Sequence, residues 1–99
     1  MMTVQIEKNS NTVTMRLEGR LDTTTAPALE KAINEECKIS EELVLDLKNL
    51  NYISSAGLRV LLGTQKKVNK QGSMKLTNVC EVVMDVLEMT GFADILVIE

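Results

Sequence analysis

Hydrophobic and polar positions alternate in the first part of the chain. Residues 3–8 and 12–18 both place an apolar side chain at every second position, which is the period of a half-buried strand. The polar cluster Asn9-Ser10-Asn11 between them is typical of a turn. The pattern therefore predicts an antiparallel hairpin at the start of the chain.

Helical spacing is found in three places. A first helix is predicted over roughly residues 25–37, with the threonines at 23–25 as hydroxyl N-caps and Pro27 in the first turn. A second helix is predicted from Ser55 as its N-cap. The third has the clearest stripe, repeating at i, i+3, i+4, i+7 and i+8, and ends at Gly91. We expect that stripe in the core: Val79, Val82, Val83, Val86 and Leu87.

Short apolar runs predict the remaining strands. Residues 43–47 form a nearly continuous run, 73–77 a short one, and 95–98 a last buried strand, while 48–53 look like a connector. The predicted order is β-β-α-β-α-β-α-β. Alternating strands and helices indicate an α/β fold with a mixed, mainly parallel sheet, three helices and the hairpin at one side. A chain of 99 residues suits a single domain, 1–99.

Composition narrows the classes of function. With two aromatic residues, a net charge of −3 and no dense basic run, direct nucleic-acid binding is not expected. The chain has no histidine, which removes histidine-based catalysis and histidine metal ligands. Cys37 and Cys80 are isolated from each other in the sequence, which favours reduced thiols in a cytoplasmic protein over a disulfide. No signal peptide, membrane span or nucleotide-binding loop is visible, so we expect a non-enzymatic protein with no cofactor and no metal site.

Candidate chemistry lies where strands lead into helices. In parallel sheets these junctions meet at one rim, which would bring Gly19–Thr25 and Asn49–Gly57 together, with Thr77–Val79 as a third junction. Ser55, at the positive end of a helix, could carry a phosphoryl group of roughly −1.5 to −2 charge. Gly57 would keep that approach uncrowded. Asp22 and Asp46, if close, would oppose the new charge. The plain alternative is that Ser55 and the Asp22 segment only cap their helices.

Four segments resemble STAS domains of the anti-sigma factor antagonist type. The resemblance covers nearly the whole chain, and its elements come in the family's order. The segments are residues 19–22 (GRLD), 43–47 (LVLDL), 53–62 (ISSAGLRVLL) and 90–92 (TGF).

The resemblance implies a bacterial, cytoplasmic partner-switching module. Its unmodified form would bind an anti-sigma factor that is also a serine kinase; phosphorylation would release it, and a serine phosphatase would reset it. The acceptor falls on Ser55. Ser54 is the alternative, because it stands where the family commonly has Asp, and Ala56 stands where the family commonly has Ser or Thr. The expected partner-binding positions are Asp22, Thr23, Thr24, Asp46, Ser54, Ala56, Gly57, Leu58 and Arg59.

A second reading of the resemblance needs no chemistry at the serine. The chain would then be a scaffold or accessory STAS subunit of a lipid-transport or stress-sensing complex. In both readings we expect a monomer that forms hetero-complexes.

Overall fold

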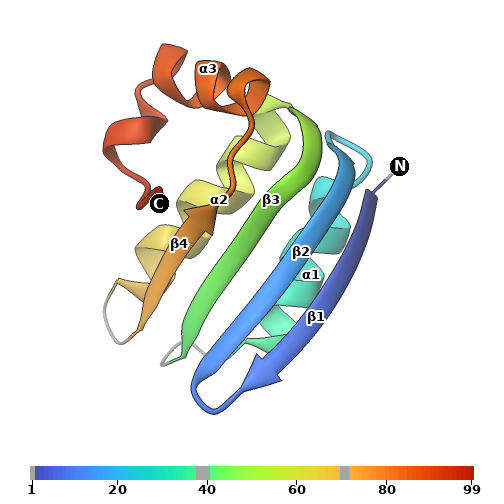
Figure 1. The fold of residues 1–99 in the computed structure, drawn as a ribbon, viewed down its shortest axis with the longest axis vertical. Helices are drawn as coiled ribbons and strands as arrows, with labels where there is room; N and C mark the ends of the chain where they lie inside the picture. Colours follow the sequence, from blue (N-terminus) through green and yellow to red (C-terminus); the bar gives the residue numbers. More distant parts are fainter. Residues whose placement is uncertain (1, 38–40, 70–71) are drawn as a thin grey trace.

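The computed structural model describes residues 2–37, 41–69 and 72–99 (Figure 1). The elements are β1 (Met2–Asn9), β2 (Thr12–Leu21), α1 (Ala26–Glu36), β3 (Glu42–Ile53), α2 (Ser55–Val68), β4 (Ser73–Thr77), α3 (Glu81–Met89) and the 3-10 turn η1 (Phe92–Asp94).

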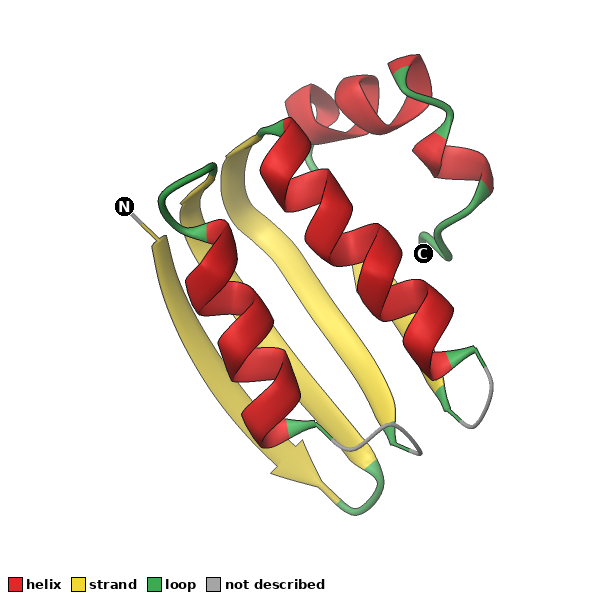
Figure 2. Cartoon of the chain, turned by 180° about the vertical axis from the view of Figure 1, so that it is seen from behind, coloured by secondary structure: helices red, strands yellow, loops and turns green. Residues whose placement is uncertain are grey.

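The four strands form one sheet in the order β1-β2-β3-β4. β1 pairs antiparallel with β2, while β2 with β3 and β3 with β4 are parallel. Helices α1 and α2 lie side by side on one face of this sheet (Figure 2). α3 lies beyond the end of β4, against the last part of β3 (Figure 1). The predicted α/β class, the hairpin, the mainly parallel sheet and the three helices are confirmed.

The predicted last strand, 95–98, is wrong. Gly91 adopts a left-handed conformation (φ 80°) that ends α3 and starts η1, so few residues remain for a ladder. A single bridge joins Leu76 to Ile98, with hydrogen bonds from the Leu76 N–H to the Val97 carbonyl and from the Glu99 N–H to the Leu76 carbonyl, both 2.9 Å. Ile95 and Val97 are half-exposed, so this apolar run does not form the buried strand that its composition predicted.

The predicted connector over 48–53 belongs to β3. The pairing with β2 shifts twice, between Arg16 and Glu18 and between Gly19 and Arg20, and each shift leaves one extra residue in β3. The buried positions of β3 therefore change from every second residue (43, 45, 47) to every third (50, 53). This change of period hid the strand from the sequence analysis. The strand continues to Ile53 and leads directly into α2.

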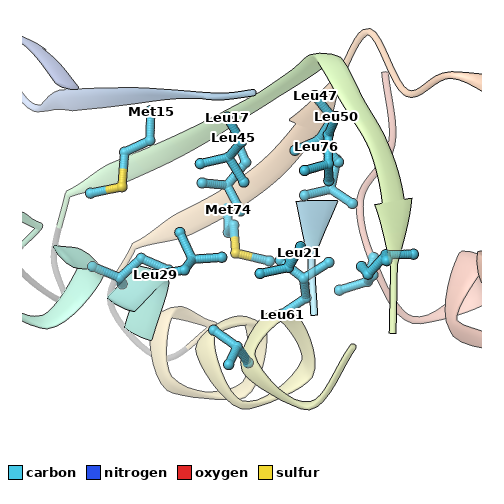
Figure 3. Close-up of a cluster of buried hydrophobic side chains, with 14 of the residues drawn as sticks. Met15, Leu17, Leu21, Leu29, Leu45, Leu47, Leu50, Leu61, Met74 and Leu76 are labelled. Carbon is cyan, nitrogen blue, oxygen red and sulfur yellow. The ribbon is translucent and has the colours of Figure 1, made fainter. Parts of the chain in front are cut away.

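An aliphatic core fills the space between the sheet and the two helices (Figure 3). It is built from fully buried side chains of β2, β3 and β4 against Leu29 of α1 and Leu61 of α2. α3 contributes fewer buried side chains to the core than its apolar stripe predicted. Val83 and Leu87 are buried, but Val82 is 58% exposed. Because α3 packs at the end of the sheet and not over its face, it buries a narrower strip of side chains.

Candidate functional site

The junctions after β2 and β3 form one rim, as the sequence predicted. Leu21 and Ile53 are paired at the ends of the two parallel strands. Immediately beyond them, the Ser54 N–H donates a hydrogen bond of 2.9 Å to the Leu21 carbonyl oxygen. The β2–α1 loop and the start of α2 are therefore held against each other by their backbones.

Asp22 organises the first of these junctions. Its Oδ1 accepts hydrogen bonds from the Thr24 hydroxyl (2.7 Å), the Thr24 N–H (3.0 Å) and the Thr25 N–H (3.2 Å). The Thr24 hydroxyl is the largest of the influences that lower the pKa of Asp22, and partial desolvation opposes them. Asp22 is thus held as a carboxylate by its own loop.

Thr25 occupies the N-cap position of α1, but its hydroxyl does not cap the helix. It donates a 2.8 Å hydrogen bond to the Arg20 carbonyl and accepts one of 2.8 Å from the Asp22 N–H. The expected hydroxyl cap is therefore wrong. The side chain turns back because the tight loop leaves these two backbone groups of Arg20 and Asp22 in need of partners.

Gly57 has a different role from the one expected. It faces the interior and is buried, and a Cβ built on it would lie 2.6 Å from Leu21 Cγ and 3.0 Å from Ile53 Cγ1. The glycine thus lets the first turn of α2 sit directly on the ends of β2 and β3. The expectation that it keeps the approach to Ser55 open is wrong, because it points away from solvent.

The two serines differ in accessibility. Ser54, not Ser55, is the N-cap of α2, one residue earlier than predicted, because β3 stays extended up to Ile53. The Oγ of Ser54 is buried and has no hydrogen-bond partner among the described residues. Ser55 is the first residue of the helix and is exposed. Of the two hydroxyls, only that of Ser55 can be reached by another protein.

The backbone around Ser55 favours a negative charge. The first helical hydrogen bond of α2 runs from the Leu58 N–H to the Ser54 carbonyl (3.0 Å), so the N–H groups of residues 55–57 precede the helical ladder. The first turn of α2 contains no acidic residue. The positive end of the helix is therefore not already neutralised by a side chain of its own first turn.

Asp46 does not lie at this rim. It precedes Ile53 by seven strand residues, roughly 20 Å along an extended chain. There it lies between Arg16 of β2 and Thr77 of β4 in the register of the sheet. Its side chain accepts a 3.1 Å hydrogen bond from Asn78 Nδ2 and lines a hollow of about 270 Å³. The Thr77–Val79 junction is also there, because the short β4 ends beside Asp46 and not beside Ile53.

The other expected partner-binding positions divide into two groups. Thr23, Thr24 and Arg59 are exposed and Ala56 is half-buried, so all four can contribute to a surface. Leu58 is 6% exposed and packs in the core.

Sequence reasoning missed Tyr52. Its ring is covered by the Arg20 guanidinium, 4.0 Å from the centroid, and Arg20 Nε lies 3.8 Å from Asp22 Oδ2. Tyr52 is 37% exposed. A useful indication was available in the sequence: the single tyrosine of the chain stands three residues before Ser55.

Among the described residues, no group of three or more cysteine or acidic side chains is placed to hold a metal ion. In the same part of the chain, no helix combines the length and apolar character needed to cross a membrane.

Comparison with known proteins matches residues 3–99 to the STAS domain family. The anti-sigma-B factor antagonist of Bacillus subtilis is 34% identical over 94 residues, covering 94% of this chain and 86% of that protein. The crystal structure of an anti-sigma factor antagonist from Mycobacterium paratuberculosis superposes with a TM-score of 0.88 at 26% identity, covering 99% of this chain and 85% of that one.

A more distant structure, the Bacillus cell fate determinant SpoIIAA in the phosphorylated form, shares the fold. Its TM-score is 0.71 at 20% identity, covering 98% of this chain and 91% of that one. The family match, the close relative and the rim geometry agree with the resemblance noted in the sequence, and the chain belongs to the STAS domain family.

Proposed function

We propose that this protein is an anti-sigma factor antagonist whose binding is switched off by phosphorylation of Ser55. One observation carries the choice of residue: Ser55 is exposed at the first position of α2, whereas the Ser54 hydroxyl oxygen is buried. The names of the relatives support the class of function. The phosphorylated form in which SpoIIAA was solved supports the type of switch.

The unmodified rim would be the binding surface. Asp22, Thr23 and Thr24 lie on the β2–α1 loop, and Ala56 and Arg59 lie on the first turns of α2. Arg20 stacked on Tyr52 extends this surface toward the open face of the sheet. Tyrosine and arginine are enriched among residues that dominate binding energy at protein interfaces. The partner would be an anti-sigma factor with serine kinase activity.

Phosphorylation would change the charge of this surface without unfolding the domain. A phosphoserine at 55 adds roughly −1.5 to −2 charge beside the N–H groups that precede the helical ladder of α2, where it is tolerated by the fold. For a partner docked on the rim, the same charge must be desolvated and adds to that of Asp22. Release therefore results from electrostatic repulsion and loss of fit, and a serine phosphatase would restore binding.

The test uses the purified protein, its cognate anti-sigma factor and ATP, with phosphopeptides read by mass spectrometry. We expect one phosphate on Ser55 in the natural protein and in Ser54→Ala, and none in Ser55→Ala. Ser55→Ala should stay bound in the presence of ATP, and Ser55→Asp should bind weakly. Phosphate on Ser55→Ala would contradict the assignment of the acceptor. Stable binding with no phosphate on any variant would instead assign the chain as a scaffold subunit.

A further inference from the structure

Gly63 is a glycine that no contact with another described residue requires. It lies in the middle of α2, where glycine costs roughly 0.5–1 kcal/mol relative to alanine. A Cβ built on Gly63 would meet no heavy atom within 4 Å, and its backbone is not in the left-handed region. Gly57 on the same helix is the contrast, because its Cβ would collide with Leu21. No contact within the described residues therefore accounts for the missing side chain at 63, which leaves it open to a role in contact with another molecule.

The position of Gly63 on α2 indicates the kind of surface to which it belongs. Ser55, Arg59, Gly63 and Lys66 are all exposed and succeed each other at intervals of four, four and three residues, which places them on one side of a helix. We call this set the α2 stripe. Gly63 lies about 12 Å along the helix from Ser55, at 1.5 Å per residue.

The α2 stripe carries only positive charge. Helix α2 contains no aspartate or glutamate. Within the described part of the chain, Arg59 and Lys66 have no hydrogen-bond or ion-pair partner, whereas the neighbouring Lys67 donates to Asn34 of α1. Two unpaired cations on either side of a bare glycine form a surface that complements an acidic segment.

We propose that the α2 stripe docks an acidic segment of the anti-sigma factor, whose backbone approaches α2 closely at Gly63. The inference rests on the proposed function and extends it from the rim along the helix. A glycine allows another backbone to come within contact distance, which a methyl group would prevent. Arg59 and Lys66 supply the attraction and set the register of the segment along α2.

The same surface explains how one phosphate could release the partner. A phosphoserine at 55 stands one helical turn before Arg59, the i, i+4 arrangement in which an anion and a cation pair favourably. Side chains of a helix also lean toward its N-terminus, which brings the guanidinium toward residue 55. The phosphate would occupy Arg59 and repel the acidic segment at once.

The decisive variant is Gly63→Ala, because stability and binding should move in opposite directions. The melting temperature of the free protein should rise by about 2–8 °C, since a better helix former enters open space. Affinity for the purified cognate anti-sigma factor, measured by titration calorimetry without ATP, should fall about tenfold or more. Arg59→Glu and Lys66→Glu should also weaken binding, and Lys31→Glu on α1 is the control with the same change of charge on an exposed helix.

The outcomes separate this inference from the proposed function. Gly63→Ala binding as tightly as the natural protein would overturn the docking surface and leave the antagonist function standing. A Gly63→Ala variant of lowered melting temperature would overturn it as well, because the glycine would then serve the fold. If Lys31→Glu weakened binding as much as Arg59→Glu, the attraction would be general and not localised on α2. A natural protein that does not bind at all would overturn the proposed function itself.

Discussion

Both junctions of the rim lead from a parallel strand into a helix, but they differ in how their polar groups are satisfied. After β2, the loop satisfies its own polar groups: Asp22 Oδ1 accepts hydrogen bonds from Thr24 and Thr25, and the Thr25 hydroxyl bonds backbone groups of Arg20 and Asp22. After β3, the Ser54 hydroxyl has no partner in the described chain, and Ser55 faces solvent. The first loop is a self-contained support. The second junction exposes only the Ser55 hydroxyl, at the N-terminus of α2, and this is the position where a modification can be read by another protein.

This contrast depends on how closely the start of α2 packs on the ends of β2 and β3. Gly57→Ala should therefore have the largest effect on the free energy of unfolding. The new Cβ would lie 2.6 Å from Leu21 Cγ and must displace the fully buried Leu21 side chain or the backbone on either side of the contact. We expect a loss of about 2–3 kcal/mol in the free energy of unfolding, as in overpacked cores. Urea denaturation measures it, with Gly63→Ala as a control that should not destabilise. An unchanged urea midpoint would show that the rim can relax at no cost.

The hydrogen bonds within the β2–α1 loop can be removed by a substitution at Thr25. Thr25→Val keeps the shape of the side chain but leaves the Arg20 carbonyl and the Asp22 N–H without their partner. Loss of about 1–2 kcal/mol of unfolding free energy is expected for such buried groups. Thr23→Val is the control, since Thr23 is exposed and has no hydrogen bond to another described residue. Equal effects of the two substitutions would show that the hydroxyl of Thr25 contributes nothing.

Acid should lower the stability of the protein by protonating Asp22 in the same loop, with a smaller effect than Thr25→Val. Because its hydrogen bonds lower the pKa of Asp22 below the ordinary 3.8, the folded state favours the carboxylate. The stabilisation is therefore fully present above the ordinary value and is lost as the pH falls through the lowered one. The measurement compares urea midpoints of the natural protein and Asp22→Asn between neutral pH and pH 2. A gap that does not change in acid would contradict this view of Asp22.

The smallest effect is expected on the other junction. Ser54→Ala removes a buried hydroxyl that has no partner in the described chain, so the free energy of unfolding should change by less than about 0.5 kcal/mol or rise slightly. Differential scanning calorimetry can resolve it. A loss above about 1 kcal/mol would mean that the hydroxyl is hydrogen-bonded to bound water and is structural after all.

Features that depend on the order of elements could be predicted from the sequence, and features that depend on strand register could not. That Asp22 and Ser55 share a rim requires only that β2 and β3 be parallel, which the alternation of strands and helices indicated. That Asp46 lies far from Ser55 depends on the true length of β3, and two bulges concealed its last six residues. The one-residue error at the N-cap has the same origin, because only the extended path to Ile53 shows that Ser54 precedes the helix. The inward direction of Gly57 requires the packing partner, Leu21, which is 36 residues away in the chain.

The hydrogen bond from the Ser54 N–H to the Leu21 carbonyl joins the two junctions mechanically. If the β2–α1 loop and the start of α2 move apart, this bond must break, so it opens in any local fluctuation that separates the two junctions. The exchange rate of the Ser54 amide with deuterated solvent thus reports the breathing of the whole rim. A modification at the neighbouring residue that tightened or loosened this bond would be felt at Asp22 without any movement of the sheet.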